Sequence, residues 1–408
     1  MTTQIQTHTL PNGLRIAHLP VNSQVSYCGF AVNAGTRDEK ANEHGLAHFV
    51  EHMLFKGTSK RKAWHILNRM ENVGGELNAY TTKESTFIYS IFMEKDFERA
   101  AELISDLITN SQFPENELKK EREVILDEIQ SYEDSPSELI FDDFENLLFD
   151  GHPLGHHILG SKRSLKSFNT TSGKTFLERF YTAENMVFFS MSHIDFKRVI
   201  KIAERYMSDI PSQKQSFTRV KPDEIAAQEV LKRKKTHLSH VIIGGRAYDM
   251  HSKNKYPLFL LNNILGGPGM NNRLNVSLRE KHGLVYNVES NITSYTDTGV
   301  FSIYFGTDPK NRERATNLVE KEMSALRTNK LTTTQLTAAK KQAIGQLGIA
   351  GDNKESMFLG LGKSFLHFNR YDPLPDIFAK IENITAEQIL ETANNTLFLP
   401  NLSKIIFE

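Results

Sequence analysis

Residues 47–57 read AHFVEHMLFKG, and this stretch organises the interpretation of the whole chain. Its apolar side chains recur at helical spacing, which predicts an amphipathic helix with one buried stripe. They are Leu46, Phe49, Val50, Met53 and Leu54. His48, Glu51, His52 and Phe55 form a second stripe about 200° around the helix from the first. The helix can therefore bury one face and present the other to a cleft.

Two histidines four residues apart on one helical face can bind the same metal ion. Zinc favours nitrogen and carboxylate ligands, and a catalytic zinc site needs three protein ligands and one water. Glu51 lies next to His52 and one turn from His48, close enough to take a proton from that water without binding the ion. The motif HxxEH is the inverted form of the HExxH helix of zinc peptidases. The alternative is a surface helix with three polar side chains.

A third ligand is available in residues 121–129, which read EREVILDEI. Glu121 and Glu128 are spaced to share one helical face. One of them can bind zinc while the other supports a ligand histidine from behind. Spacing alone does not choose between the two, and acidic helix faces are often simply solvated.

Strands and helices are mixed along the first half and joined by short connections, which predicts an α+β fold with mainly antiparallel sheets packed against helices. A hairpin is expected in residues 4–19, with its turn at residues 11–13 (PNG). The other elements follow in order: a strand at 25–34, the motif helix, a helix ending at 74–75, two strands in 76–93, and helices at 94–110 and 115–131.

The second half repeats this pattern without the metal ligands. Residues 258–267 (LFLLNNILGG) align with 47–57, and residues 331–348 align with 113–130. Phe259, Asn262, Asn263 and Gln346 then stand where the first half has His48, Glu51, His52 and Glu128. We therefore predict an N-terminal zinc-binding catalytic domain (1–212), a polar linker (213–224) and a metal-free C-terminal domain of similar fold (225–408).

Composition excludes several classes of partner. Basic and acidic residues both number 49, so the chain has no general electrostatic attraction for nucleic acid. No apolar run approaches the roughly 18 residues of a membrane span, and no secretory signal is recognisable at the start. The single cysteine, Cys28, lies in an apolar run and is expected in the core. These features favour a cytoplasmic protein.

Taken together, these motifs make the chain similar to the pitrilysin/insulinase family over nearly its whole length. It resembles the half-length branch that includes mitochondrial processing peptidase and related bacterial peptidases. Besides HxxEH and residues 121–129, the resemblance rests on five further stretches: 74–81 (GGELNAYT), 152–155 (HPLG), 181–186, 278–281 (LREK) and Tyr286. It implies one zinc ion per chain, with Glu128 as the third ligand and Glu121 as the supporting carboxylate.

The resemblance implies a zinc metalloendopeptidase that cleaves peptides or unfolded segments inside a closed chamber. Glu51 would act as the general base and then protonate the leaving amine. Asn78 and Ala79 match the sheet edge on which such enzymes hold the substrate as an added strand. The alternative for Asn78 is a turn residue.

Arg279 and Tyr286 match an arginine and a tyrosine that contact the substrate backbone, the tyrosine hydroxyl stabilising the oxyanion. On sequence alone they would be a helix-surface arginine and a strand tyrosine. In full-length members this pair lies in the half without the zinc motif. We therefore expect a homodimer in which Arg279 and Tyr286 of one subunit complete the zinc site of the other.

Specificity residues are also suggested by the resemblance. Phe55 matches a position that receives an aromatic residue just after the cleaved bond, and Glu138 and Asp142 match positions that receive an arginine before it. The alternatives are core packing for Phe55 and a solvated acidic turn for the pair. For the whole chain, the rival functions are a non-catalytic subunit and a subunit active only with a different partner, but the intact ligand set favours an enzyme.

Overall fold

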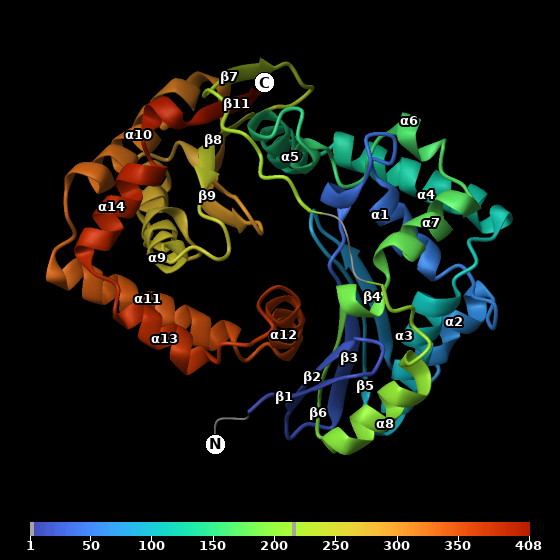
Figure 1. The fold of residues 1–408 in the computed structure, drawn as a ribbon. Coiled ribbons are helices and arrows are strands. Elements are labelled where there is room, and N and C mark those ends of the chain that lie inside the picture. Colours follow the sequence, from blue (N-terminus) through green and yellow to red (C-terminus); the bar gives the residue numbers. More distant parts are fainter. Residues whose placement is uncertain (1–3, 214–217) are drawn as a thin grey trace. The chain divides into compact units, whose positions relative to one another are not determined.

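The strands predicted around residues 11–13 form an antiparallel hairpin in the computed structural model, which describes residues 4–213 and 218–408. Gly13, in the turn, has a φ of 92°, a conformation that glycine adopts without a steric penalty. The predicted linker, 213–224, includes residues 214–217, which lie outside the described residues. The described chain divides into two units, and each is treated by itself below (Figure 1).

The first unit consists of Met1–Gln130, His156–Arg219 and Asp352–Tyr371. Its strands are β1 (Gln6–Thr9), β2 (Arg15–Pro20), β3 (Val25–Val32), β4 (Glu76–Thr81), β5 (Thr86–Met93) and β6 (Met186–Ser192). Its helices are α1 (Leu46–Leu54), α2 (Ala63–Glu71), α3 (Phe97–Asn110), most of α4 (Glu115–Glu133), α6 (Lys162–Leu165), α7 (Thr170–Phe180), α8 (Phe196–Met207) and α12 (Lys354–Phe368). The elements predicted for the first half are thus confirmed.

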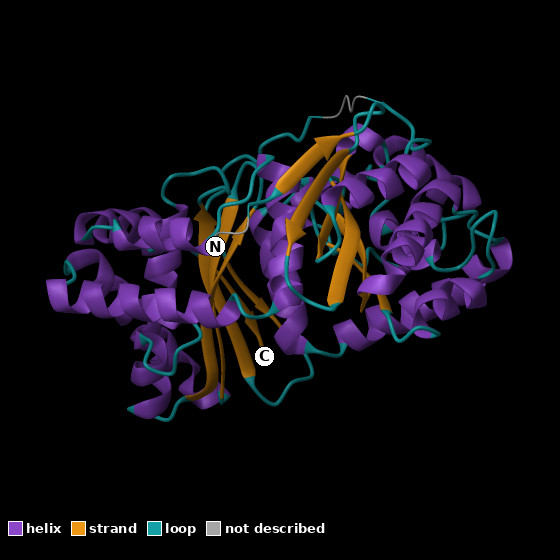
Figure 2. Cartoon of the chain, turned by 90° about the horizontal axis from the view of Figure 1, so that it is seen from below, coloured by secondary structure: helices purple, strands orange, loops and turns teal. Residues whose placement is uncertain are grey.

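The second unit consists of Ser131–Gly155, Val220–Gly351 and Asp372–Glu408. Its strands are β7 (Glu229–Lys232), β8 (Ser239–Ala247), β9 (Val285–Ser294), β10 (Gly299–Thr307) and β11 (Ser403–Phe407). Its helices are α5 (Pro136–Leu148), α9 (Lys255–Gly266), α10 (Arg312–Thr328), α11 (Thr333–Ala350), α13 (Leu374–Glu382) and α14 (Ala386–Thr396). Figure 2 distinguishes the strands of both sheets from the helices packed on them.

The two sheets have the same topology apart from one extra strand. The first has the order β1-β2-β6-β3-β5-β4 and the second β7-β11-β8-β10-β9. In each sheet one parallel pair, β2 with β6 or β7 with β11, is followed by antiparallel pairs. The α+β class and the repeat of one fold in the two halves are therefore confirmed.

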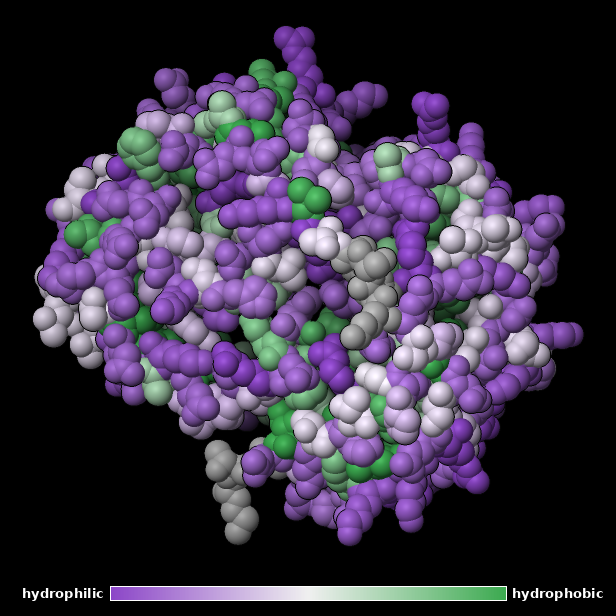
Figure 3. Space-filling view, viewed as in Figure 1, coloured by the Kyte–Doolittle hydropathy of each residue, from purple (hydrophilic) through white to green (hydrophobic). Residues whose placement is uncertain are grey.

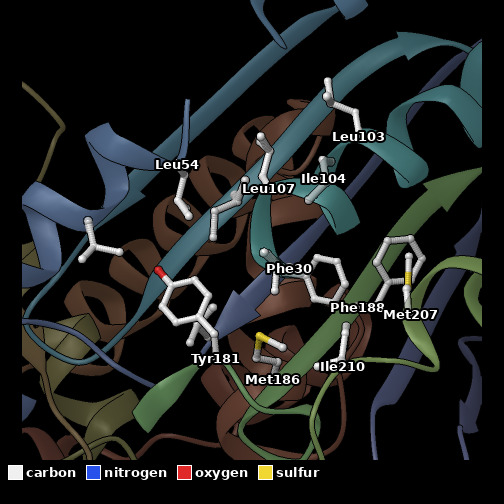
Figure 4. Close-up of a cluster of buried hydrophobic side chains, with 14 of the residues drawn as sticks. Phe30, Leu54, Leu103, Ile104, Leu107, Tyr181, Met186, Phe188, Met207 and Ile210 are labelled. Atoms are coloured by element: carbon white, nitrogen blue, oxygen red, sulfur yellow. The ribbon is translucent and has the colours of Figure 1, made fainter. Parts of the chain in front are cut away.

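Each sheet is covered by helices on both faces, and the strand side chains alternate between the two. In β3, Cys28 and Phe30 belong to the core under α1 and α3, whereas Tyr27 and Ala31 pack against α12 on the other face. This is the period of two expected for a strand buried on both sides. Figure 4 shows part of the core on the α3 side, where Leu107 lies near Phe30.

The helices α5 and α12 follow equivalent helices, α4 and α11, but each packs outside its own half of the sequence. Helix α12, from the second half, covers β2, β3 and β6, and α5, from the first half, covers β8 and β11. The predicted domains, 1–212 and 225–408, assign α5 to the first domain and α12 to the second, and so do not describe this exchange. Apolar residues on α5, including Ile140 and Phe144, bury themselves against Ile242 and Phe407 of the second sheet.

Hydrophilic residues cover most of the face drawn in Figure 3, with apolar side chains in separate patches. Among the described residues, none of the helices is both long enough and apolar enough to cross a lipid bilayer.

Candidate metal centre

Helix α1 places the motif residues by burying its opposite side. Its five predicted apolar residues are all buried in the core of the first unit. The start of α1 is held by the carboxylate of Glu39, which accepts hydrogen bonds from the backbone N–H groups of Gly45 (2.9 Å) and Ala47 (2.7 Å). A carboxylate at a helix N-terminus satisfies N–H groups that have no partner within the helix. The buried stripe and these two hydrogen bonds together hold α1 in an orientation that turns His48 and His52 away from the core.

Three potential metal ligands converge between α1 and α4. The distance from Glu128 Oε2 is 3.7 Å to His48 Nε2 and 3.7 Å to His52 Nε2. The three ligand atoms lie within 4.8 Å of one another. Ligands about 2.1 Å from a tetrahedral zinc ion would be about 3.4 Å apart. Two imidazole nitrogens and one carboxylate oxygen at this spacing fit a single zinc ion. The Glu128 side chain is 44% exposed, so solvent can reach the point where the three ligands meet.

Glu121 occupies a different position from Glu128. Its Oε1 lies 2.8 Å from Nδ1 of His52, and its Oε2 lies 2.6 Å from Nζ of Lys56. Burial would raise the pKa of Glu121, but the bonds from His52 and Lys56 outweigh it and lower the pKa. An ionised Glu121 accepts a hydrogen bond from Nδ1–H of His52, which leaves the lone pair on Nε2, on the side of Glu128.

The two histidines differ in their surroundings. Burial, with a smaller contribution from the neighbouring His52, lowers the pKa of His48 to about 3. Burial also acts to lower the pKa of His52, but the bond to Glu121 and the charges of Glu51 and Glu128 outweigh it and raise the pKa. His48 is therefore neutral at neutral pH, the form in which imidazole binds metals.

Glu51 is buried beside the converging ligands, with 9% of its surface exposed. Its Oε2 accepts a hydrogen bond of 2.5 Å from the hydroxyl of Thr81, at the end of β4. Burial raises the pKa of Glu51, and the bond from Thr81 offsets part of that effect. A buried carboxylate with a raised pKa next to a cation site is suited to move protons.

Sequence reasoning singled out neither Thr81 nor Lys56 for a role at this site. Lys56 had a usable signal, because it follows His52 by four residues, although the structure places it in the turn just after α1. Thr81 lies in the stretch 74–81, but no local pattern relates it to Glu51, because its approach to Glu51 depends on how β4 packs under α1.

Strand β4 carries Asn78 and Ala79 at the edge of the first sheet. They pair with Tyr89 and Ile88 of β5, and β4 is the last strand in the sheet order on that side. Asn78 lies within the strand and not in a turn. An edge strand of this kind offers unpaired backbone groups to an added strand.

The other predicted site residues lie as follows. Phe55 caps the end of α1 and packs, half-buried, on the core of the first unit. In the second unit, Glu138 and Asp142 lie on α5. Arg279 lies in the short helix η5 (Asn275–Glu280), Tyr286 lies on β9, and both side chains are exposed.

Comparison with known protein families gives two matches. Residues 16–162 match the model described as insulinase (peptidase family M16), and residues 167–343 match the model described as the peptidase M16 inactive domain. The first match contains the motif helix and the candidate residues Glu121 and Glu128 of α4. The second contains Phe259 and Asn263, which replace the two histidines, and ends three residues before Gln346.

Relatives are similar over almost the full length. The chain is 30% identical to an uncharacterised zinc protease of Bacillus subtilis, covering 94% of each chain. It is 32% identical to an uncharacterised zinc protease of Rickettsia felis, covering 97% of this chain and 96% of the relative. It is 30% identical to the beta subunit of the mitochondrial-processing peptidase of Bos taurus, covering 95% and 81%.

Solved structures share the fold. A protease from Helicobacter pylori superposes with a TM-score of 0.92 at 20% identity, with all of both chains covered. A structure described as a peptidase M16 inactive domain from Pseudomonas fluorescens gives a TM-score of 0.91 at 21% identity, with 99% and 97% covered. With near-complete relatives at 30% identity or above and matches to both family models, this chain belongs to the insulinase family, peptidase family M16.

Proposed function

We propose that this protein is a zinc metalloendopeptidase with His48, His52 and Glu128 as the zinc ligands and Glu51 as the general base. One observation carries the proposal: three ligand atoms from α1 and α4 converge at the spacing of a zinc site, beside a buried carboxylate that belongs to none of the three. The names of the relatives, which include zinc proteases, support the same metal and reaction.

Zinc, when bound, supplies a Lewis acid that polarises the scissile carbonyl and the attacking water. Glu51 takes the proton from that water and later delivers it to the leaving amine. Glu121 keeps Nε2 of His52 directed at the ion, because it accepts a hydrogen bond from Nδ1–H. The side chains with these roles lie on α1 and α4, and their hydrogen-bond partners lie on α1, α4 and β4.

The substrate is proposed to be a peptide or an unfolded segment. The free edge of β4 at Asn78 and Ala79 supports binding of an extended chain as an added strand, with backbone hydrogen bonds supplying the affinity. Such binding requires an extended segment, so that folded proteins would be poor substrates. A closed chamber around the substrate stays a prediction from the family resemblance.

A homodimer is proposed, with Arg279 and Tyr286 of each subunit completing the partner's zinc site. The exposure of both side chains supports a role toward a bound group or a second chain. Mixing inactive Glu51→Gln subunits with inactive Tyr286→Phe subunits should restore activity, because one site of the mixed dimer is intact. Lack of recovery, with subunit exchange demonstrated, would contradict the arrangement.

Specificity is proposed to involve Phe55 for an aromatic residue after the cleaved bond, and Glu138 and Asp142 for an arginine before it. The half-buried packing of Phe55 in the core is equally compatible with a structural role. A peptide panel that shows no gain from an arginine two residues before the cleaved bond would argue against Glu138 and Asp142.

The alternative function is a non-catalytic or partner-dependent subunit, and the match of residues 167–343 to an inactive domain is the observation that favours it. That match, however, begins after all four candidate residues of the metal centre. The complete ligand set and base in the first unit favour an active enzyme. The cytoplasmic location stays a prediction from composition.

The direct test measures zinc content and cleavage of an unfolded peptide, with and without a chelator. Glu51→Gln should keep one zinc per chain and lower turnover by about 10²- to 10⁴-fold, the usual contribution of general acid–base catalysis. Glu123→Gln, on the exposed side of α4, is the matched control and should retain turnover. Chelator-resistant cleavage, or full activity of Glu51→Gln, would contradict the proposal.

A further inference from the structure

We propose that Thr81 is a positioning residue for the general base and that it links the substrate-binding strand β4 to Glu51. This inference rests on the proposed peptidase function. It concerns a residue to which neither the motif nor the comparisons assign a role. The observation behind it is the 2.5 Å hydrogen bond from the Thr81 hydroxyl to Oε2 of Glu51.

The direction of the Thr81 side chain follows from the alternation of β4. Leu77 and Ala79 pack on the core that includes the apolar face of α1. Tyr80 points to the opposite face, where its ring stacks on Phe87 with centroids 4.8 Å apart. Since strand side chains alternate, Thr81 faces the same side as Leu77 and Ala79, toward α1.

The backbone around Thr81 is held in place by its pairing with β5 and by the turn that follows. Thr81 pairs with Thr86 of β5, whose hydroxyl donates to the carbonyl of Ala34 (3.0 Å). The chain reverses immediately after Thr81, and the amide of Thr82 donates to the carbonyl of Ser85 (2.8 Å). Thr81 is thus the last residue of an edge strand and is anchored by a tight turn. On its other side, β4 pairs with no further strand of the described residues, and a substrate can add there.

A hydroxyl donor at this place solves a specific problem for a buried base. A carboxylate has two oxygens, and a base that takes a proton from water and returns it to an amine needs one of them aimed at the reacting atoms. Thr81 engages Oε2, which leaves Oε1 for proton transfer. Because a hydroxyl has a single proton, donation to Oε2 also fixes the rotation of the Thr81 hydroxyl.

Binding of substrate and orientation of the base are then coupled through one short strand. A peptide added to β4 forms backbone hydrogen bonds along the strand and restricts its motion. Thr81 lies two residues after Ala79 on that strand, so ordering of the strand also orders the donor to Glu51. The base is best oriented when an extended chain occupies the edge.

The test compares Thr81→Val, which keeps the β-branched shape without the hydroxyl, with Thr81→Ser, which keeps the hydroxyl. Loss of a hydrogen bond to a charged group predicts a decrease in kcat of roughly 10- to 100-fold for Thr81→Val. KM should change less than about twofold, since a donor to the base acts on the chemical step. Zinc content and the thermal unfolding midpoint should stay close to those of the parent, and Thr81→Ser should recover most of the kcat.

The matched control is Thr7→Val, the same substitution at an exposed position of β1, the edge strand at the other end of the sheet. It should leave kcat unchanged. The inference is overturned if Thr81→Val keeps the parent kcat, if its defect lies in KM or zinc content alone, or if Thr81→Ser is as impaired as Thr81→Val. A parent enzyme that binds zinc but cleaves no peptide would instead overturn the proposed function, and the role of Thr81 with it.

Discussion

The candidate metal centre of the first unit and the corresponding place in the second unit lie on equivalent helices but carry different chemical groups. In the first, α1 and α4 bring His48, His52 and Glu128 together, with ligand atoms 3.7 Å apart and no direct hydrogen bond between the helices at these atoms. In the second, Asn263 of α9 donates from Nδ2 to Oε1 of Gln346 on α11 at 2.7 Å.

The difference explains why we expect a cation at the first place and none at the second. An amide has both a donor and an acceptor, so Asn263 and Gln346 can form a direct hydrogen bond with no ion between them. A neutral imidazole nitrogen with a free lone pair and a carboxylate oxygen are both acceptors, and they cannot bond without a proton or a metal between them. The supporting charges are also replaced, because Ala339 stands where the first half has Glu121 and Gly267 where it has Lys56.

The largest expected effect comes from making the first unit resemble the second. Glu128→Gln should weaken zinc binding more than about a hundredfold, since even supporting residues contribute 10- to 100-fold. The reciprocal change, Gln346→Glu, should leave zinc at one ion per chain, because the second unit has no histidine at either equivalent position. Zinc content measured against a competing chelator checks both. An unchanged affinity of Glu128→Gln would contradict the assignment of the ligand.

The second effect concerns acid stability of the metal-free chain. His18 in the first unit is fully buried, with Nδ1 2.9 Å from the hydroxyl of Ser190, and burial lowers its pKa to about 4. A histidine whose folded pKa lies below the unfolded value binds more protons when unfolded. Its stabilisation is therefore present above about pH 6.5 and is lost as the pH falls toward 4. Between pH 7 and pH 5 the loss is about 2 kcal/mol.

The buried histidines of the first unit, His18 and His156, are expected to make acid weaken it more than the second. The raised pKa values of His52 and Glu51 act in the opposite direction, since those groups bind more protons in the folded state. Burial also lowers the pKa of His156 in the first unit, to about 3. In the second unit, burial lowers the pKa of His240. Hydrogen exchange of amides in β3 and β10, followed from pH 7 to pH 5 and corrected for intrinsic rates, should show greater loss of protection in β3. His18→Gln should reduce that difference, and equal loss in both sheets would be the contrary result.

The smallest effect tests the outer support of the metal centre. Lys56→Met removes the cation that holds Glu121, 2.6 Å away, but leaves all three ligands in place. We expect zinc affinity to fall by about tenfold, at the low end for supporting residues. Lys119→Met, exposed on α4, is the control and should leave the affinity unchanged. A zinc affinity equal to that of the parent would mean that Glu121 keeps its position without Lys56.

Local pattern was sufficient for the motif helix and for most elements of the first half. Helical and strand periodicity placed the apolar stripe of α1 in the core, and the turn at residues 11–13 marked the first hairpin. These signals are local because each depends on residues a few positions apart. The repeat of the fold was also visible, because both halves keep the same apolar scaffold.

Spacing could not distinguish Glu121 from Glu128, since both lie on one face of α4. The structure places Glu121 at Nδ1 of His52 and Glu128 near both Nε2 atoms, a distinction that depends on how α4 crosses α1. The exchange of α5 and α12 could not be predicted from the sequence either. An amphipathic pattern predicts that a helix has a buried face, but it does not indicate which sheet that face packs on.

The sequence by itself determined the chemistry available to this protein: two histidines and a glutamate on one face of a helix, acidic residues on another helix, and a second half without these groups. Only the tertiary structure decided which acidic group meets which nitrogen and that Thr81 reaches Glu51. The reason is physical, because those contacts join residues far apart in the chain, and their distances are set by packing of α1 on β4 and α4 and not by the local pattern of any one of them.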